Sequence, residues 1–222
     1  DTRVPDHSIW THLDTVSALT GALTDDAPAL LSMSFGPVQG FIAQARSTSD
    51  LWAGSHLLSS LVWEGLKVIC AALGPDAIAF PSLRGVAAVD RWLLEVADAA
   101  GRGDQWRRRF TTIDAEWLQR TTDANPLFAA TLPNKFMAIV PARQAEQLAR
   151  QVVEAVREAA RAWAAEAAQH ALDDRDQGQH WQEQLDSQLA GFPEAQWAIA
   201  EWPTGSDRDC LPDADRLRQA LA

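Results

Sequence analysis

The spacing of apolar residues predicts how the first part of the chain folds. Apolar side chains recur every three or four positions over residues 8–23, which is typical of an amphipathic helix. Residues 29–35 alternate instead, so that Leu31, Met33 and Phe35 face one side of the backbone. This alternation predicts a strand with one buried face.

A broken helix follows that strand. The Gly-Pro pair at 36 and 37 suits the start of a helix, because a proline near the first helical position lacks an N–H that would be unpaired anyway. We expect this helix to run to about Arg46. Ser47 or Ser49 then caps a second helix, which extends from about Asp50 to about Leu73.

The rest of the pattern predicts three further strands, a long helix and a less regular stretch. The segments are a short strand at 76–81, an insertion at 82–131 with helices at 89–99 and 104–120, a strand at 135–141, a helix at 142–172 and a strand at 195–203. The strand at 135–141 is apolar on both faces and should therefore be central. The order βαββαβ is that of a ferredoxin-like α+β fold, with helices on one face of an antiparallel sheet.

Composition and charge narrow the possible functions. Of the 222 residues, 47% are hydrophobic, which is enough for a sizeable core, and the net charge is −11. An acidic chain is unsuited to bind nucleic acid by itself, because phosphate neutralisation needs clustered Lys and Arg. We interpret the run from Arg107 to Arg109 as a solvated helix face rather than an RNA contact. The chain starts at Asp1 rather than Met, so we expect a piece of a longer protein.

Cysteine and tryptophan positions indicate packing. Cys70 lies within an apolar helical pattern and reads as a small buried hydrophobe, and its spacing to Cys210 is not that of a metal site. Two distant cysteines fit a reducing cytoplasm.

No apolar run approaches 18 residues, so we expect no membrane span. Four of the ten tryptophans lie in patterned segments and are expected in the core: Trp52, Trp63, Trp163 and Trp197.

The broken helix carries the candidate chemistry. A strand that ends in glycine at a helix start presents free backbone N–H groups, which attract anions such as phosphate. The candidate nucleotide-binding residues are Gly36, Gln39, Arg46, Gly54 and Ser55. Glycine lets a ligand approach the backbone, Gln39 and Ser55 offer polar contacts, and Arg46 pairs with phosphate or carboxylate. The alternative is that the small residues serve tight packing and bind no ligand.

The histidines give a weaker signal. His7, His12 and Asp14 are metal-ligating residue types, but their spacing does not place the two histidines on one helix face. We therefore favour capping and packing roles for them. His56 adjoins Ser55 and is either a ligand contact or, as is more common, a residue on a helix surface. We expect no catalytic residue and no metal site in this chain.

Three stretches, in order, resemble one known family. The runs SFGPVQGFIAQARSTSDLWAGSHLLSSL at 34–61, GPDAIAFPSLRGVAAVDRWL at 74–93 and LPNKFMAIVP at 132–141 are similar to the first palm domain of the large, Cmr-type subunit of type III-B CRISPR interference complexes. Residues 3–23 resemble the end of the HD-type domain that precedes this palm. The resemblance implies three regions: the end of the HD-type domain at 1–26, a polymerase/cyclase-like palm with its insertion at 27–205, and the start of a following helical region at 206–222.

The family implies an activity for the parent protein. Its two palm domains together bind ATP and join it into cyclic oligoadenylates when target RNA is bound, and its HD domain is a nuclease. The second palm carries a GGDD hairpin that holds Mg²⁺. The implied partners are the second palm, the other subunits of the complex and, indirectly, guide and target RNA, in the cytoplasm and without a membrane.

The chain departs from the catalytic pattern of that family. It contains no GGDD, and Ser32 and Ser34 stand on the first strand where two-metal nucleotidyl transfer needs carboxylates. We therefore expect a non-catalytic palm that holds ATP from one side and is inactive alone. A structural module that only docks neighbouring subunits is the alternative, and an unrelated regulatory ferredoxin-like domain is a third.

Overall fold

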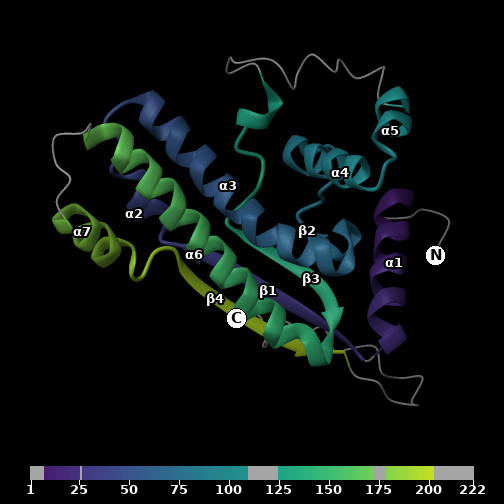
Figure 1. Cartoon of the computed structure of the whole chain (residues 1–222). Coiled ribbons are helices and arrows are strands. Elements are labelled where there is room, and N and C mark those ends of the chain that lie inside the picture. The colour runs from purple at the N-terminus through teal and green to yellow at the C-terminus, as the bar shows by residue number, and fades with distance from the viewer. Residues whose placement is uncertain (1–7, 26, 110–124, 173–178, 203–222) are drawn as a thin grey trace.

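Four strands form one antiparallel sheet (Figure 1). The computed structural model describes residues 8–25, 27–109, 125–172 and 179–202. The strands are β1 (Pro28–Gly36), β2 (Ile78–Phe80), β3 (Lys135–Pro141) and β4 (Glu194–Glu201), in the order β2-β3-β1-β4 with every neighbouring pair antiparallel. This confirms an α+β fold, and β3 is a central strand, as its apolar pattern predicts.

Two long helices cover one face of this sheet. α3 (Thr48–Leu73) and α6 (Ala142–Leu172) pack against each other and against the sheet (Figure 1). Their periodic apolar stripes and the alternate residues of the strands meet in one core. Its fully buried members include Leu31, Met33, Leu66, Ile69, Phe136, Val152 and Val156. The core therefore lies where the two predicted periodicities, helical and strand, face each other.

Two small residues of α3 fix its place in this core. A Cβ on Gly65 would lie 2.8 Å from Val156 Cγ2 and 3.0 Å from Val152 Cγ1, so only glycine allows this close approach of α3 to α6. Ser59 is buried, and its Oγ accepts a 3.0 Å hydrogen bond from the backbone N–H of Leu132, just before β3. The serine thus ties the helix to the loop that leads into the central strand.

The N-terminal helix α1 (Ile9–Asp25) lies on the opposite face of the sheet. It packs on the sheet through a second, small hydrophobic cluster. The cluster consists of the buried Ala18, Ala22 and Ile139 with the partly buried Leu19 and Leu30. Leu30 is next to Leu31 on β1, and successive strand residues point to opposite faces. Most large apolar side chains of α1 remain exposed: Ile9, Trp10, Leu13, Val16 and Leu23.

The described parts of the long link between β2 and β3 contain three helical segments. Its described elements are α4 (Ala87–Ala99), α5 (Gly103–Arg109) and the short η3 (Pro126–Phe128), and a short η1 (Pro75–Ala77) precedes β2. α4 confirms the helix predicted at 89–99. α5 is the described part of the helix predicted at 104–120, and residues 110–120 lie outside the described residues. A further helix, α7 (Gln179–Leu189), precedes β4.

Arg107, the first residue of the basic run on α5, pairs with acidic neighbours. Arg107 forms ion pairs with Asp98 and, at 3.6 Å, with Asp104. All three side chains are largely exposed, so these pairs are typical of a solvated helix surface.

The helix predicted from position 37 to about Arg46 is wrong in its length. α2 spans only Val38–Ile42, about one turn. Gly40 lies in its middle, and glycine is a poor helix former. Ser47 caps α3 in an extended conformation, so a continuous helix cannot join the two segments.

The assignment of four tryptophans to the core is half wrong. Trp63 is buried and Trp163 packs against the core, but the Trp52 and Trp197 side chains are 45% and 39% exposed. Trp52 lies near the start of α3 and Trp197 on the edge strand β4, where a periodic pattern does not ensure that another element covers the side chain.

Cys70 is free and buried, as predicted. Its burial raises the pKa of its thiol to about 12, and the nearby Asp76 charge contributes to this rise.

The sequence predicts no membrane-spanning helix, but one described helix has the length and apolar composition of such a span. This helix is α3. The core helix of a globular protein meets the same criteria, and 44% of the apolar window of α3 is buried inside the fold.

Candidate functional site

The predicted site residues lie where β1 leads through α2 into α3. Ser47 Oγ accepts a 3.1 Å hydrogen bond from the Asp50 backbone N–H, which confirms Ser47 as the cap. The Asp50 carboxylate in turn accepts a 3.0 Å hydrogen bond from the Arg46 backbone N–H. This pair of hydrogen bonds satisfies the Asp50 N–H, one of the groups that a helix start leaves unpaired. It also fixes the backbone of Arg46, whose side chain is exposed and forms no ion pair with any described residue.

Two of the predicted residues have internal roles. A Cβ on Gly54 would lie 3.3 Å from Cε1 of Phe41, so the glycine lets α2 pack closely on α3. Phe41 also stacks on Phe192, with ring centroids 5.6 Å apart. The Ser55 hydroxyl donates a 2.9 Å hydrogen bond to the Leu51 carbonyl within α3. Packing therefore accounts for Gly54 and helix hydrogen bonding for Ser55 without any ligand.

A large cavity lies between α2, α3 and α6. It measures about 1010 Å³ and includes Arg46 and Gly54 in its walls, but not Gly36, Gln39 or Ser55. Gln39 is exposed on α2 and Gly36 ends β1. The structure thus brings two of the five predicted residues to one cavity. Its other walls are mainly aromatic and apolar: Phe41, Ile42, Trp52, His56, Leu57 and Trp163.

His56 stands at the boundary between this cavity and a second one. The second cavity, about 620 Å³, lies between α3, α4, η3 and α6, and the two share His56, Ser60 and Trp163. The His56 ring stacks on Trp52 at 5.8 Å and meets the Phe128 ring edge-on at 5.9 Å. The sequence indicates His56 as a candidate because it adjoins Ser55. It does not indicate that Phe128 contacts His56, because 73 chain positions separate Ser55 from Phe128.

The two ring nitrogens of His56 differ in their surroundings. Nε2 lies 3.5 Å from Ser60 Oγ, at the limit of a hydrogen bond, whereas Nδ1 is buried and has no hydrogen-bond partner among the described residues. Burial lowers the pKa of His56 below its ordinary value of 6.5. At neutral pH the ring is therefore mainly uncharged, and its unpaired Nδ1 lies out of contact with solvent.

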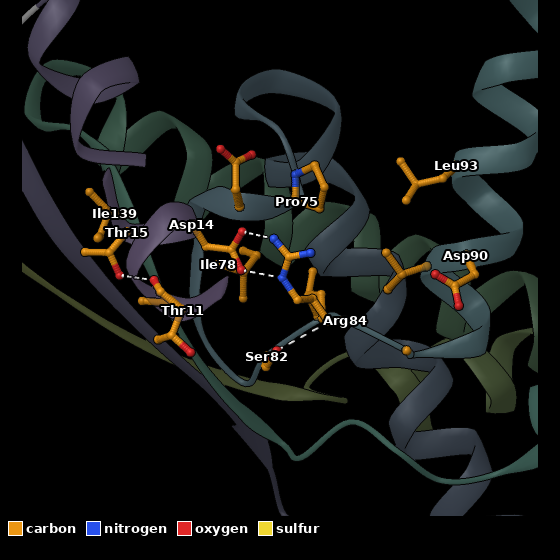
Figure 2. Close-up of a pocket in the computed structure, with 15 residues that line it drawn as sticks. Thr11, Asp14, Thr15, Pro75, Ile78, Ser82, Arg84, Asp90, Leu93 and Ile139 are labelled. Atoms are coloured by element: carbon orange, nitrogen blue, oxygen red, sulfur yellow. Dashed lines mark hydrogen bonds and ion pairs between the residues drawn. The ribbon is translucent and has the colours of Figure 1, made fainter. Parts of the chain in front are cut away.

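A third cavity, about 320 Å³, separates α1 from α4 (Figure 2). The Arg84 guanidinium points at the Asp14 carboxylate, with Nε donating to Oδ2 at 2.8 Å and Nη2 donating to Oδ1. Arg84 also lies over the Trp10 ring, 5.1 Å from its centroid. These contacts support the packing role for Asp14. His7 lies outside the described residues, and within the described part of the chain no three His, Cys, Asp or Glu residues are placed to hold a metal ion.

The geometry defines an α+β domain in which α2, α3 and α6 border a cavity with mainly aromatic and apolar walls. Residues 30–168 match the family described as CRISPR-associated protein Cmr2, N-terminal. The chain therefore belongs to the Cmr2 N-terminal family, which confirms the resemblance to the large Cmr-type subunit.

Two curated relatives agree with this assignment. The CRISPR system Cmr subunit Cmr2 of Pyrococcus furiosus is 37% identical over 158 residues, which cover 71% of this chain and 15% of that protein. The corresponding subunit of Saccharolobus solfataricus is 38% identical over 88 residues, which cover 38% of this chain and 8% of that protein. The chain thus spans only a small part of the relatives it matches.

Two solved structures share the fold. A type III-B Cmr-beta chain in the apo state matches with a TM-score of 0.62 and 22% identity, over 90% of this chain and 22% of that one. A Cmr-beta chain from a complex bound to cognate target RNA matches with a TM-score of 0.67 and 19% identity, over 100% of this chain and 25% of that one. At these identities the likeness shows the fold alone.

Proposed function

We propose that this chain is a ferredoxin-like palm domain of the large subunit of a type III-B CRISPR defence complex, and that it binds one side of an ATP molecule. The strand order β2-β3-β1-β4, with α3 and α6 on one face, supports the ferredoxin-like description. In this proposal the parent subunit makes cyclic oligoadenylates in the cytoplasm. A second palm of the same parent completes the site, and guide and target RNA act through the other subunits.

One observation supports nucleotide binding most directly. Arg46 carries a guanidinium that forms no ion pair with a described carboxylate, and it lies in the wall of a cavity that is mainly aromatic and apolar but also includes Gln44, Asp50 and Ser60. Ligand pockets typically combine apolar walls with a few polar groups that orient the ligand. A guanidinium suits a phosphate group, which it can bind through two parallel hydrogen bonds. ATP has both an anionic and a planar aromatic part, and the residues present fit it.

The chain's residues would position ATP rather than transform it. Ser32 and Ser34 occupy β1 where metal-binding carboxylates would be needed, so we assign Mg²⁺ to the second palm. When bound there, the metal would supply charge neutralisation for the transferring phosphoryl group. Arg46 would orient the phosphates, and the aromatic walls would contact the rest of the nucleotide.

Calorimetric titration of Mg-ATP tests this proposal, with the 222-residue chain and with the parent subunit. Arg46→Gln should weaken binding about tenfold or more, because a charged hydrogen bond contributes roughly 1.5–3 kcal/mol. Arg150→Gln is the matched control, since Arg150 is exposed on α6 and lies in the wall of neither cavity. Equal affinities for the wild type and Arg46→Gln would contradict the proposal.

The second candidate function is a docking module without nucleotide binding. The internal roles of Gly54 and Ser55 favour it, because the small residues then need no ligand. It predicts that Mg-ATP binds neither the chain nor this half of the parent subunit, while this domain still associates with its neighbours.

A further inference from the structure

The two edges of the sheet differ in how they are protected. β2 has only three residues, its register with β3 shifts between Ile78 and Phe80, and Pro81 follows it. Short strands, irregular register and proline are features by which sheet edges avoid pairing with other chains. β4, at the opposite edge, has eight residues without a proline or a lysine and pairs with β1 in continuous register (Figure 1). The edge at β4 therefore lacks these protective features.

The backbone of β4 alternates between positions that bond to β1 and positions that face outward. The Trp202 N–H donates a 2.8 Å hydrogen bond to the Pro28 carbonyl, and these two residues continue the register in which Glu201 lies opposite Ala29. In an antiparallel pair, every second residue directs both backbone groups at its partner, and the residues between them direct theirs away. The even-numbered residues of β4 therefore bond to β1. The odd-numbered ones point their N–H and C=O groups away from it: Ala195, Trp197, Ile199 and Glu201. No described strand lies on that side.

A partly exposed tryptophan lies beside these outward backbone groups. Trp197 is opposite Met33, which is buried under the helices, so both side chains point to the same face of the sheet. Ala195 and Ile199 on this face pack against the core, whereas the Trp197 side chain is 39% exposed. A strand added at this edge would cover the indole from its open side. The edge thus combines an apolar anchor with the row of main-chain donors and acceptors that strand addition uses.

The charges along this edge indicate what kind of strand fits it. β4 carries an exposed carboxylate at each end, Glu194 and Glu201, and no basic residue. The preceding helix α7 adds Glu183 and Asp186, and residues 181–202 contain no Lys or Arg. A second copy of β4 in antiparallel pairing would bring two carboxylates to each end and supply no cation. A strand with a Lys or Arg near each end and apolar residues between them complements both the carboxylates and the indole.

We propose that an extended segment of the parent subunit, with a basic residue near each end, pairs with the outer edge of β4 and adds a fifth strand to the four-stranded sheet. This chain covers a small part of the relatives it matches, so most of a parent of similar length lies outside it. A segment of the same polypeptide has a high effective concentration and needs little affinity of its own. The inference goes beyond the proposed function, because no step in it involves a nucleotide.

Hydrogen exchange resolved to single amides by mass spectrometry tests this proposal, in the 222-residue chain and in the parent subunit. In the chain, the odd-numbered amides of β4 should exchange rapidly, and those of Gln196, Ala198 and Ala200 slowly. In the parent subunit, the odd-numbered amides should exchange at least tenfold more slowly than in the chain. Slowing at alternate amides is specific to strand pairing, because a covering surface without its own strand offers no regular row of acceptors.

A charge reversal in the parent subunit tests the chemistry of the added strand. Glu194→Lys together with Glu201→Lys places like charges at both basic ends and should speed exchange of the odd-numbered amides about threefold or more. Glu154→Lys together with Glu158→Lys is the matched control. It makes the same change of charge at exposed positions of α6 and should leave these amides unaffected. Equal exchange in the wild type and the β4 variant would overturn the basic ends.

Two proline variants test the direction of the backbone groups. Ala195→Pro removes an outward N–H that does not bond to β1. It should speed exchange at Trp197 and Ile199 in the parent subunit while changing the thermal unfolding midpoint of the isolated chain little. Ala198→Pro removes an N–H that bonds to β1 and should lower that midpoint clearly. Equal midpoints for the two variants would contradict the alternation on which the open edge depends.

The remaining outcomes also decide the proposal. If the odd-numbered amides already exchange slowly in the isolated chain, or exchange as fast in the parent subunit as in the chain, no segment of the parent pairs with β4 and the proposal is wrong. If they become slow only when the other subunits of the complex are added, the strand belongs to another subunit and its assignment to the parent is overturned. Neither result bears on Mg-ATP binding, so the failure of this inference and that of the proposed function are distinguishable.

Discussion

The two faces of the sheet hold their helices in different ways. On the face covered by α3 and α6, large side chains such as Leu66 and Ile69 are completely buried. On the opposite face α1 buries mainly Ala18 and Ala22, and Ile9 of the same helix is 63% exposed. Both layers come from apolar, periodic segments, yet only one of them is sealed from water.

This difference shows that apolar periodicity does not by itself measure how firmly a helix is attached. The stabilisation follows the apolar area removed from water, which is large between α3, α6 and the sheet and small under α1. Directional contacts hold α1 instead, with Arg84 paired to Asp14 and stacked on Trp10. We therefore expect changes in the α3–α6 layer to destabilise the whole domain, and changes at α1 to act locally.

The largest expected effect is that of a cavity in the sealed layer. Leu66→Ala should lower the free energy of unfolding by about 2–5 kcal/mol, because the removed methyl groups leave space that the packed core fills only in part. Leu19→Ala, at a half-buried position of α1, should cost only ~1 kcal/mol. Urea denaturation followed by circular dichroism measures both. Equal losses would contradict the distinction between the two faces.

A smaller effect, with opposite signs on the two helices, is expected for glycine substitution. Gly65→Ala should destabilise by about 1–2 kcal/mol, because overpacking against Val152 and Val156 exceeds the gain in helix propensity. Gly21→Ala on α1 should stabilise by ~0.5–1 kcal/mol, since a Cβ there meets nothing within 4 Å. Denaturant midpoints of the two variants should therefore shift in opposite directions. A shift of Gly65→Ala to higher midpoint would mean that the α3–α6 contact is looser than described.

The smallest effect on global stability is expected for the ion pair that holds α1. Asp14→Asn should cost about 0.2–1 kcal/mol, because Arg84 is about half exposed, and the cost should shrink at high salt. Amide hydrogen exchange should nevertheless rise clearly over α1 and stay unchanged in α3. Glu95→Gln, which breaks the exposed Arg91–Glu95 pair within α4, is the matched control and should leave α1 unaffected. Faster exchange in β3 as well as α1 would show that the two layers are coupled.

The sequence by itself determined most of the elements and the main part of the core. Strict alternation over Leu31, Met33 and Phe35 required a strand with one buried face, and all three are buried. The apolar run at 135–141 predicted a central strand, which the sheet order confirms. Ser47 or Ser49 with Asp50 predicted a helix start, and the structure has Ser47 as the cap. These features depend on local periodicity and capping chemistry, which neighbouring residues specify.

Tertiary structure decided the site and the attachment of α1. Arg46, Phe128 and Trp163 are distant in sequence, and only the packing of α3, α6 and η3 places all three in the walls of cavities that meet at His56. Arg84 and Asp14 are 70 positions apart, and no repeat in the sequence pattern predicts that they pair. Likewise, the exposure of Trp52 depends on where the covering layer stops. Periodicity specifies which face of an element is apolar, but the packing of distant elements determines whether that face is covered, and by what.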